Sequence, residues 1–285
     1  MYGSRRAKLF AARLLPQFIK EPFRARLFGY RHTTVPFKLR LLPAEDGVVD
    51  VMIDDELILR APSGVMGDVR FHFQENGEAV EEMHALLRIA REVGGCIFDV
   101  GAYHGMFGVL FCLARAGNTA CCFEPSRPAL DEAGRLRGLN SLDDRVRLEE
   151  VSVGSAPGQA SAWVNDVGFA IFDESSESRS GALINVTTLD EMILRGLPVP
   201  SVVKIDVEGA EQAVLMGARD LLSRHRPILM LEFHLDIMER RGQAPREVVE
   251  LLLSLGYRFQ KLSGKKMGAR DVYDVPHAIH RVIAV

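Results

Sequence analysis

The run CIFDVGAYHGMFG, residues 96–108, contains the first side chains and glycines that could hold a ligand. Its apolar part predicts a strand that ends around Asp99 and Gly101, and Gly105 and Gly108 follow as a helix begins. Glycine lets a backbone turn sharply and approach a ligand closely. A tight strand-to-helix turn also needs glycine without any ligand, so this run alone indicates a binding site only weakly.

Glu124 stands where a nucleotide site would need an acid. It ends the next apolar run, 23 residues after Gly101, and nucleotide-binding α/β folds place there a carboxylate that hydrogen-bonds ribose hydroxyls. Pro125 keeps Glu124 extended, because proline disfavours a helical conformation in the residue before it. The predicted cofactor-binding residues are Asp99, Gly101, Ala102, Gly105, Glu124 and Pro125.

Charge at the turn distinguishes between two adenosine cofactors. A dinucleotide would bring its pyrophosphate to the start of the helix, where the carboxylate of Asp99 would repel it. S-adenosylmethionine carries an ammonium and a sulfonium and no phosphate, so an acid at position 99 suits it directly or through water. The spacing also departs from the dinucleotide fingerprint G-x-G-x-x-G, since Ala102 and Tyr103 stand where its second glycine would be. S-adenosylmethionine is the predicted cofactor, and NAD is the alternative.

A second set of charged residues follows a later strand candidate. Lys204, Asp206 and Glu208 alternate along the end of a strand that a parallel sheet would bury on both faces. Charges there are costly unless they are paired or functional. We expect Lys204 to pair with a neighbouring carboxylate such as Glu232. Asp206 and Glu208 are predicted to face a ligand, because ligands of open α/β sheets bind beyond the carboxyl ends of the strands.

Glu232 and His234 end the next strand candidate in the same way. A lone histidine is often only a packed or surface group. The neighbouring acids favour a role for His234, either as a general base with an orienting carboxylate or as a ligand of Mg²⁺ or Mn²⁺. We predict Asp206, Glu208 and His234 as catalytic residues and assign no metal.

These residues need a fold that brings strand ends together. Strand candidates CIFDV, TACCFE, VRLEEVSV, SVVKIDV and PILMLEFH alternate with helical stretches at 106–116, 128–139, 189–195, 210–223 and 245–255. Such alternation predicts an α/β, Rossmann-like fold, a mostly parallel sheet with helices on both faces. YRFQKL and AIHRVIAV are expected to close the sheet, the last as an antiparallel edge or neighbour.

The N-terminal part has a different pattern. Short strand-like runs between 37 and 73 predict a small β-rich cap, and a helix is expected over 78–93. We divide the chain into a basic N-terminal arm and cap, 1–77, and a Rossmann-like domain, 78–285. The polar, glycine-rich stretch 154–181 predicts a hairpin with a loop that either lines the acceptor site or is a solvated excursion.

Composition narrows the class of partner. The chain has 47% hydrophobic residues, 26% charged residues and a net charge of −3, which is typical of a globular protein and disfavours nucleic acid as a partner. Pro16 and Pro22 favour short packed helices in the basic arm over a membrane-surface helix. Because no apolar run reaches the roughly 18 residues of a membrane span, we expect a cytoplasmic protein.

The four cysteines all lie in apolar runs, which suggests buried thiols rather than zinc ligands or disulfides: Cys96, Cys112, Cys121 and Cys122.

Three further segments carry a family resemblance: VTTLDEM at 186–192, VVKIDVEGAEQAVLMGARDLL at 202–222 and PILMLEFH at 227–234. With FDVGAYHG and CFEPS they resemble the FkbM-type methyltransferases, over about half the chain. The resemblance implies a Rossmann-like sheet, S-adenosylmethionine, and O-methylation of a hydroxyl on a sugar, polyketide or other small metabolite. Tyr103 and His104 depart from that family's usual small polar residue after Gly-Ala. An NAD-dependent oxidoreductase and a catalytically inactive cofactor-binding protein are the alternative functions.

Overall fold

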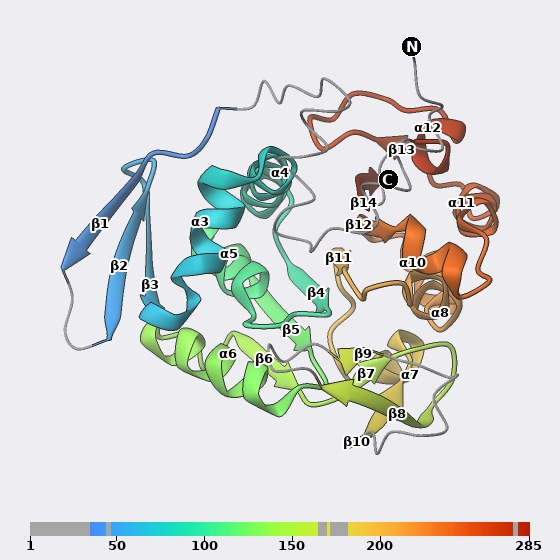
Figure 1. The fold of residues 1–285 in the computed structure, drawn as a ribbon, viewed down its shortest axis with the longest axis horizontal. Coiled ribbons are helices and arrows are strands. Elements are labelled where there is room, and N and C mark those ends of the chain that lie inside the picture. The colour runs from blue at the N-terminus through green and yellow to red at the C-terminus, as the bar shows by residue number, and fades with distance from the viewer. Residues whose placement is uncertain (1–34, 44–46, 165–169, 172–181, 276–278) are drawn as a thin grey trace, which may run out of the picture.

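The computed structural model describes residues 35–43, 47–164, 170–171, 182–275 and 279–285. The basic arm and much of the 154–181 stretch lie outside these residues. The described chain folds around a seven-stranded sheet in the order β13-β14-β12-β11-β4-β5-β6 (Figure 1). Its strands are β4 (Cys96–Val100), β5 (Thr119–Phe123), β6 (Val146–Glu149), β11 (Val202–Ile205), β12 (Ile228–His234), β13 (Phe259–Gln260) and β14 (Ile279–Ala284).

The sheet is parallel from β6 through β12, and β14 runs antiparallel between β12 and β13. The predicted fold class and the antiparallel closing strand are therefore confirmed. β4 is buried along its whole length, as the unbroken apolar run predicted. Asp99, Lys204 and Asp206 stand at the carboxyl ends of β4 and β11, which pair in register with Lys204 opposite Asp99.

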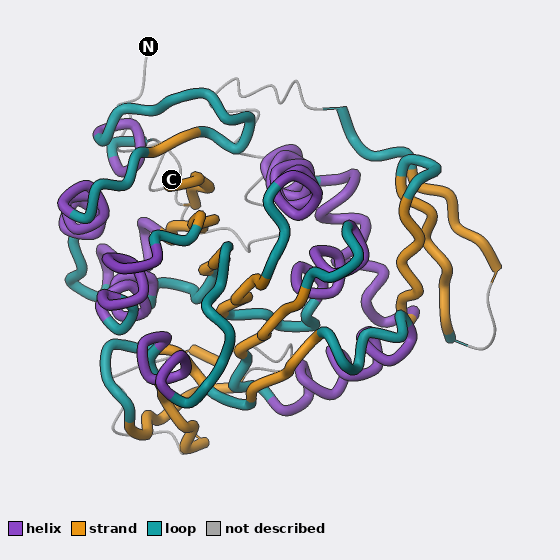
Figure 2. The backbone as a smooth tube through the Cα atoms, turned by 180° about the vertical axis from the view of Figure 1, so that it is seen from behind, coloured by secondary structure: helices purple, strands orange, loops and turns teal. Residues whose placement is uncertain are grey.

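Helices cover both faces of the sheet (Figure 2). One face packs against α4 (Gly77–Glu92), α5 (Met106–Ala114) and α6 (Arg127–Leu139). The other packs against α7 (Leu189–Leu194), α8 (Glu211–Met216), α9 (Arg219–His225), α10 (Leu235–Arg240), α11 (Pro245–Ser254) and α12 (Arg270–Tyr273). Sheet residues alternate between the two cores, so Ile97 faces α4 and α5 while Phe98 faces the opposite layer.

The helix predicted over 210–223 is interrupted between α8 and α9. Gly217 lies at the break, and a Cβ there would meet the carbonyl oxygen of Gly154 at 2.1 Å. Close packing against the neighbouring backbone therefore replaces a straight continuation of the helix. The strand predicted over VRLEEVSV is also divided, because β6 joins the central sheet whereas β7 (Ser152–Val153) pairs with β10 (Ala182–Thr187).

A small antiparallel sheet, β1-β2-β3, lies apart from the central sheet beyond α3 and α5 (Figure 1). It comprises β1 (Leu39–Pro43), β2 (Val48–Ile53) and β3 (Leu57–Pro62), which confirms the β-rich cap. The prediction of strands is wrong beyond Pro62. Three helical segments follow there: η1 (Ser63–Val65), α3 (Met66–Arg70) and the π-helix η2 (Phe71–Glu75). Met66, Val69 and Phe73 are buried there, so the apolar residues pack at helical rather than alternating spacing.

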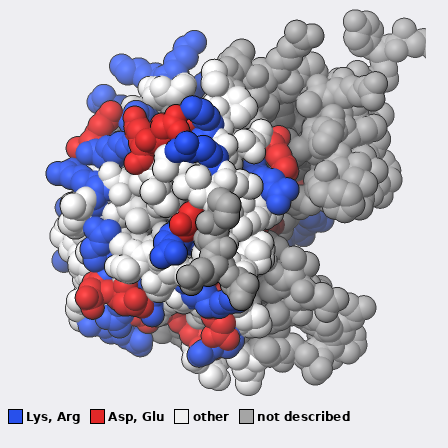
Figure 3. Space-filling view, turned by 90° about the vertical axis from the view of Figure 1, so that its left-hand side faces the viewer, with Lys and Arg blue, Asp and Glu red and all other residues white. Residues whose placement is uncertain are grey.

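A second small sheet, in the order β7-β10-β8-β9, contains β8 (Gly158–Val164) and β9 (Ala170–Ile171). β8 pairs antiparallel with β9 and with β10, so the predicted hairpin is present. None of the described helices is long and apolar enough to cross a bilayer. On the described part of the face in Figure 3, positive and negative side chains lie beside one another rather than forming a field of one sign.

Candidate functional site

The turn after β4 touches the loop after β11. Gly101 has a φ of +78°, and a Cβ on it would stand 1.8 Å from the carbonyl oxygen of Asp206. The backbone N–H of Asp206 also donates to the carbonyl of Val100 at 3.0 Å. Only glycine accommodates this approach, so Gly101 joins the two strand ends on which the sequence placed its two sets of candidate residues.

The other residues of the turn are held tightly. Ala102 is buried, and Gly105 caps the start of α5 with a φ of +68°. Gly108 packs within α5 against the sulfur of Cys122, which a Cβ would meet at 2.6 Å. The packing of α5 on β5 therefore explains Gly108. This packing would require glycine whether or not the turn binds a ligand.

Asp99 lies behind the turn rather than at its surface. It is 1% exposed, and its Oδ2 accepts the Gly108 N–H at 3.2 Å while Oδ1 has no hydrogen-bond partner among the described residues. Burial raises the pKa of Asp99 to about 6, against the lowering charge of Lys204. An influence of Asp99 on a cationic ligand would therefore be electrostatic or pass through water.

Glu124 ties the turn to β5. Its Oε2 accepts the Tyr103 N–H at 3.0 Å, and its Oε1 accepts the Ser126 N–H at 2.8 Å. Burial raises the pKa of Glu124 to about 7 although both hydrogen bonds lower it. Pro125 follows and is only half-buried. Each carboxylate oxygen keeps a further lone pair, so the residue can still accept hydrogen bonds from ribose hydroxyls.

The charged groups along this edge of the sheet fit S-adenosylmethionine. Asp99, Glu124 and Asp206 are carboxylates, whereas the nearby Lys204 is already paired with Asp206. Such a set suits an ammonium, a sulfonium and two hydroxyl donors better than a pyrophosphate. Asp99 also retains one buried oxygen without a partner among the described residues, which is a polar atom available to a bound ligand or water.

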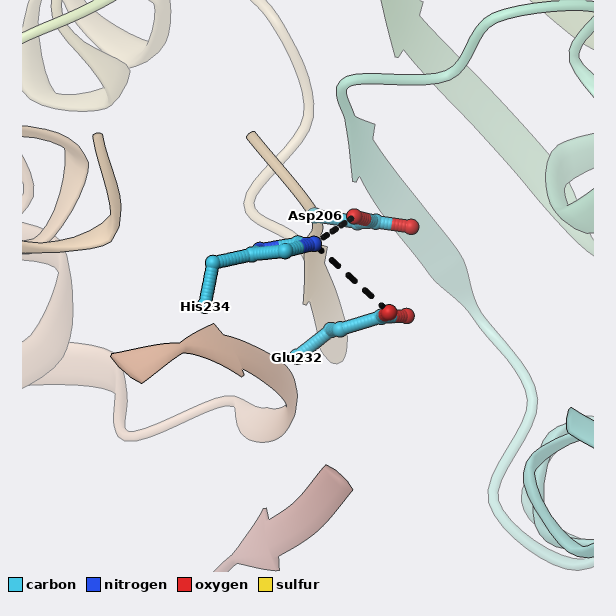
Figure 4. A group of neighbouring side chains, drawn as sticks. All are labelled: Asp206, Glu232 and His234. Carbon is cyan, nitrogen blue, oxygen red and sulfur yellow. Dashed lines mark ion pairs between the residues drawn. The ribbon is translucent and has the colours of Figure 1, made fainter. Parts of the chain in front are cut away.

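Acids and a histidine meet where β11 and β12 end. His234 points its Nε2 toward Asp206 and Glu232, with 3.8 Å to Asp206 Oδ1 and 3.7 Å to Glu232 Oε1 (Figure 4). Glu208 Oε2 lies 3.4 Å from the same nitrogen. The structure thus brings together the three residues predicted as catalytic and adds Glu232. We call Asp206, Glu208, Glu232 and His234 the acidic-histidine group.

Lys204 pairs with a different acid from the one named in the sequence analysis. Its Nζ lies 3.0 Å from Asp206 Oδ2 and 4.2 Å from the centre of the Phe107 ring. Burial would lower the pKa of Lys204, but Asp206 and other nearby acids outweigh it and keep the amine charged. The expected ion pair exists, and the expected partner Glu232 was wrong. Lys204 and Asp206 are two positions apart and so share one side of the strand end, which makes Asp206 the nearer partner.

Glu232 is held by Arg281 instead. Arg281 donates through Nη2 to Oε1 at 2.7 Å and through Nε to Oε2 at 2.9 Å, and both residues are buried. Its guanidinium also reaches Glu82 at 3.2 Å and Glu78 at 3.5 Å on α4. The bidentate geometry fixes Glu232 strongly. A row of buried charges therefore crosses the sheet from β14 to β4.

His234 is oriented from behind by Glu211, the first residue of α8. Nδ1 of His234 donates to Glu211 Oε1 at 2.8 Å, and the same oxygen accepts the Gly209 N–H at 3.0 Å. Burial alone would lower the pKa of His234, but the Glu211 hydrogen bond and the surrounding acids raise it to about 10. Burial raises the pKa of Glu208. An imidazolium on His234 would have to lose its proton before acting as a base.

Several partners in this site were not identified from the sequence. Glu211, Arg281 and Glu82 were missed because their contacts join segments as far as 203 positions apart. His72 was missed because FHF was taken as strand, whereas η2 places it edge-on to the Phe107 ring at 5.2 Å. Burial lowers the pKa of His72 to about 3, helped by the charges of Arg281 and Lys204.

Comparisons with known proteins indicate the family of this chain. The family model of the methyltransferase FkbM domain matches residues 99–259. A methyltransferase FkbM from Methylobacillus flagellatus KT is similar at 18% identity and a TM-score of 0.45, over 67% of this chain and 43% of that one. This chain thus spans less than half the length of that relative. No curated protein matches.

Two O-methyltransferases are also similar. One, from Bacillus cereus in complex with SAH, is 13% identical with a TM-score of 0.42 over 78% of this chain and 86% of its own. The other, TomG from Streptomyces achromogenes in complex with SAM, is 9% identical with a TM-score of 0.42 over 80% and 91%. The family match itself covers more than half of the 285 residues and contains every candidate residue from Asp99 to His234. This chain therefore belongs to the methyltransferase FkbM family.

Proposed function

We propose that this chain transfers a methyl group from S-adenosylmethionine, the cofactor of its family, to a hydroxyl group of a small-molecule acceptor. The observation that carries the proposal is the contact between the Gly101 turn and Asp206. The turn belongs to the predicted cofactor side and Asp206 to the predicted acceptor side. Their direct contact lets one ligand at the turn present its reactive end to the acidic-histidine group.

On the cofactor side, the chain's residues bind and orient. The backbone at Gly101, Ala102 and Gly105 forms the close wall of the site, and Glu124 accepts the ribose hydroxyls. Pro125 holds Glu124 out of α6. Asp99 favours a positively charged ligand from beneath the turn.

On the acceptor side, Asp206, Glu208 and His234 hold the hydroxyl and take part in removing its proton. When bound, the cofactor supplies a methyl group on sulfonium, and the electrons of the broken carbon–sulfur bond remain on sulfur. The acceptor oxygen contributes the electron pair of the new carbon–oxygen bond, and its proton passes to the acidic-histidine group and then to water. Holding the two reactants in line supplies much of the acceleration.

The acceptor is proposed to be a sugar, a polyketide or another small metabolite, as the family resemblance implies. Residues from the cap and from the 154–181 stretch are the candidates for selecting it, because loops and additions at the carboxyl edge of an open sheet line the substrate site. A catalytically inactive cofactor-binding protein would keep the turn and Glu124 and yet show no transfer.

Thermal unfolding with S-adenosylhomocysteine and, separately, with NAD tests the cofactor. A ligand at about a hundred times its dissociation constant adds about 2.7 kcal/mol to the free energy of unfolding. We expect stabilisation by S-adenosylhomocysteine. Stabilisation by NAD alone would contradict the proposal and favour an oxidoreductase. Transfer of labelled methyl from S-adenosylmethionine to a panel of hydroxylated metabolites then separates the enzyme from an inactive binding protein.

A further inference from the structure

His234 presents one ring nitrogen to three carboxylates that do not hydrogen-bond to it. Nε2 lies 3.4 Å from Glu208, 3.7 Å from Glu232 and 3.8 Å from Asp206. Charge-assisted hydrogen bonds are shorter, about 2.7–2.9 Å. Around an ion with bonds of about 2.1 Å, adjacent ligand atoms lie about 3.0 Å apart and opposite ones about 4.2 Å apart. The observed separations fall between these two values.

Glu211 gives an independent indication that Nε2 is prepared for a ligand. Because Glu211 is fully buried and accepts from Nδ1, the proton of a neutral His234 ring stays on Nδ1 and the lone pair of Nε2 faces the carboxylates. His234 itself is 1% exposed, and the hydrogen bond that orients its ring is made by Nδ1. A carboxylate behind one imidazole nitrogen and an ion on the other is the usual arrangement of a metal-binding histidine.

The charges around the group also favour a cation. Lys204 and Arg281 are the buried lysine and arginine among the described residues. Together with the ring of His234, they face a larger number of carboxylates: Asp99, Asp206, Glu208, Glu211, Glu232, Glu78 and Glu82. Buried negative charge in excess of its partners is costly unless a proton or another cation offsets it.

The loop beside the group has a strained backbone at Glu208. Glu208 has a φ of +50° and precedes Gly209, with a φ of +92°. A non-glycine residue in this region costs about 1–3 kcal/mol and persists where surrounding contacts hold it. Here the Gly209 N–H is bound by Glu211, so one residue fixes both the loop that carries Glu208 and the ring of His234.

We propose that Asp206 Oδ1, Glu232 Oε1 and His234 Nε2 bind one divalent cation, since these three atoms all lie within 4.8 Å of one another. Two carboxylate oxygens and one imidazole nitrogen suit Mn²⁺ or Mg²⁺ better than ions that prefer sulfur. Lys204 binds the other oxygen of Asp206, and Arg281 donates to both oxygens of Glu232, so Glu232 Oε1 would share its lone pairs between Arg281 and the ion.

The group is open on one side, since the side chains of Asp206 and Glu208 are 27% and 34% exposed. A bound ion therefore keeps positions for water or for the acceptor hydroxyl, whose proton it makes easier to lose to water. This use of the ion rests on the proposed function. Binding of the ion does not.

Mn²⁺ binding to the full-length chain, first stripped with a chelator, tests the proposal. Free Mn²⁺ is measured by electron paramagnetic resonance during titration, with and without S-adenosylhomocysteine. His234→Gln is the main variant, because it removes a ligand and leaves the Lys204–Asp206 and Arg281–Glu232 pairs in place. Asp206→Asn is the second variant. Asp68→Asn is the matched control, since Asp68 holds the ring of His104 at 2.7 Å without further acids in that contact.

We expect one Mn²⁺ per chain, binding at least tenfold weaker in His234→Gln and Asp206→Asn, and unchanged binding in Asp68→Asn. Folding of each variant is checked by circular dichroism. A folded wild-type chain that leaves millimolar Mn²⁺ free, with or without S-adenosylhomocysteine, would overturn the proposal and indicate that a proton on His234 balances the acids. Equal binding by all variants would overturn it too. If the chain binds S-adenosylhomocysteine but not Mn²⁺, the ion site is overturned and the proposed function stands. If it binds Mn²⁺ but not S-adenosylhomocysteine, only the proposed function is contradicted.

Discussion

Glu124 shows how a buried residue that holds the fold can keep hydrogen-bonding capacity for the proposed ligand. Its two oxygens fix the backbone of Tyr103 and Ser126, so the turn keeps its shape without any cofactor. Its raised pKa means that a proton or a hydroxyl donor on the carboxyl offsets part of the cost of burial.

Replacing Glu124 by alanine is expected to weaken S-adenosylhomocysteine binding by one to two decades. A lost hydrogen bond to a charged group costs about 1.5–3 kcal/mol. Calorimetric titration measures the affinity, and circular dichroism confirms the fold. Glu150→Ala is the control, because Glu150 is an exposed acid paired with Arg127. Unchanged affinity in a folded Glu124→Ala chain would remove this residue from the site.

The pKa of Glu124 also predicts a pH dependence. With a pKa of about 7, the carboxyl is mostly protonated at pH 6 and mostly ionised at pH 8. The ionised form accepts both ribose hydroxyls, so affinity for S-adenosylhomocysteine should rise by up to about tenfold over this range. The contribution of Glu124 to the stability of the ligand-free chain has the opposite sign. The folded state binds more protons than the unfolded state between about 4.5 and 7, so that contribution decreases as pH rises. A flat affinity profile would contradict the assignment.

His234→Ala is expected to lower kcat at least tenfold while the affinity for S-adenosylhomocysteine stays nearly unchanged. The residue lies on the proposed acceptor side, where three acids are within 4 Å of its Nε2. A group that acts mainly in the transition state changes kcat more than ground-state binding. Steady-state kinetics with the identified acceptor checks this. Wild-type turnover in the folded variant would exclude both a proton-transfer role for His234 and a catalytic role for an ion bound to it.

At the scale of the element, α4 carries Glu78 and Glu82 to the buried charge row. It begins at Asn76, whose Oδ1 accepts the N–H groups of Glu78 and Ala79 at 3.1 and 3.0 Å. This cap satisfies two backbone donors that the helix itself cannot.

Asn76→Ala is expected to lower the free energy of unfolding by about 1 kcal/mol, because no side chain then caps α4. Asn76→Ser is the matched control, since serine also caps helices and should cost only a few tenths of a kcal/mol. Chemical denaturation measures both. Equal stability of the alanine and serine variants would show that the cap does not hold α4.

The elements were predictable where periodicity and length agreed. The run CIFDV and the apolar spacing of α4 are continuous, and both form as predicted. The sequence did not reveal the interruption at Gly217, because it arises from a contact with Gly154 that is distant along the chain. Nor did it reveal the helical turns after Pro62, where Phe71 and Phe73 alternate like strand residues. The proximity of Asp206 and His234 could be predicted, because both stand at the ends of strand candidates. The position of Arg281 could not, because it depends on how β14 pairs with β12.

At the scale of the whole molecule, the cap and the central sheet share one core. Val51, Leu59 and Phe73 are fully buried in the same cluster as side chains of α4 and α5. Asn140 at the end of α6 also bonds the backbone of Arg60 in both directions, at 3.0 and 2.8 Å. The boundary after residue 77 therefore remains a prediction about sequence pattern, and the packing argues for joint unfolding.

We expect a single calorimetric transition in which Leu59→Ala lowers the Tm of the whole molecule. Removing a buried leucine side chain costs about 2–5 kcal/mol. Ile58→Ala is the matched control, because Ile58 neighbours Leu59 on β3 but is 46% exposed. An early, separate transition that alone responds to Leu59→Ala would show instead that the cap unfolds independently.

The position of β14 between β12 and β13 has a consequence for synthesis on the ribosome. β13 emerges before β14 but pairs with the rest of the sheet only through it. Until residues 279–284 have left the exit tunnel, a nascent chain has no Arg281 to bind Glu232, Glu82 and Glu78. Those acids would then stay hydrated or protonated, and α4 could not settle on that part of the sheet. The final packing of this face therefore requires β14, even if the turn after β4 forms earlier.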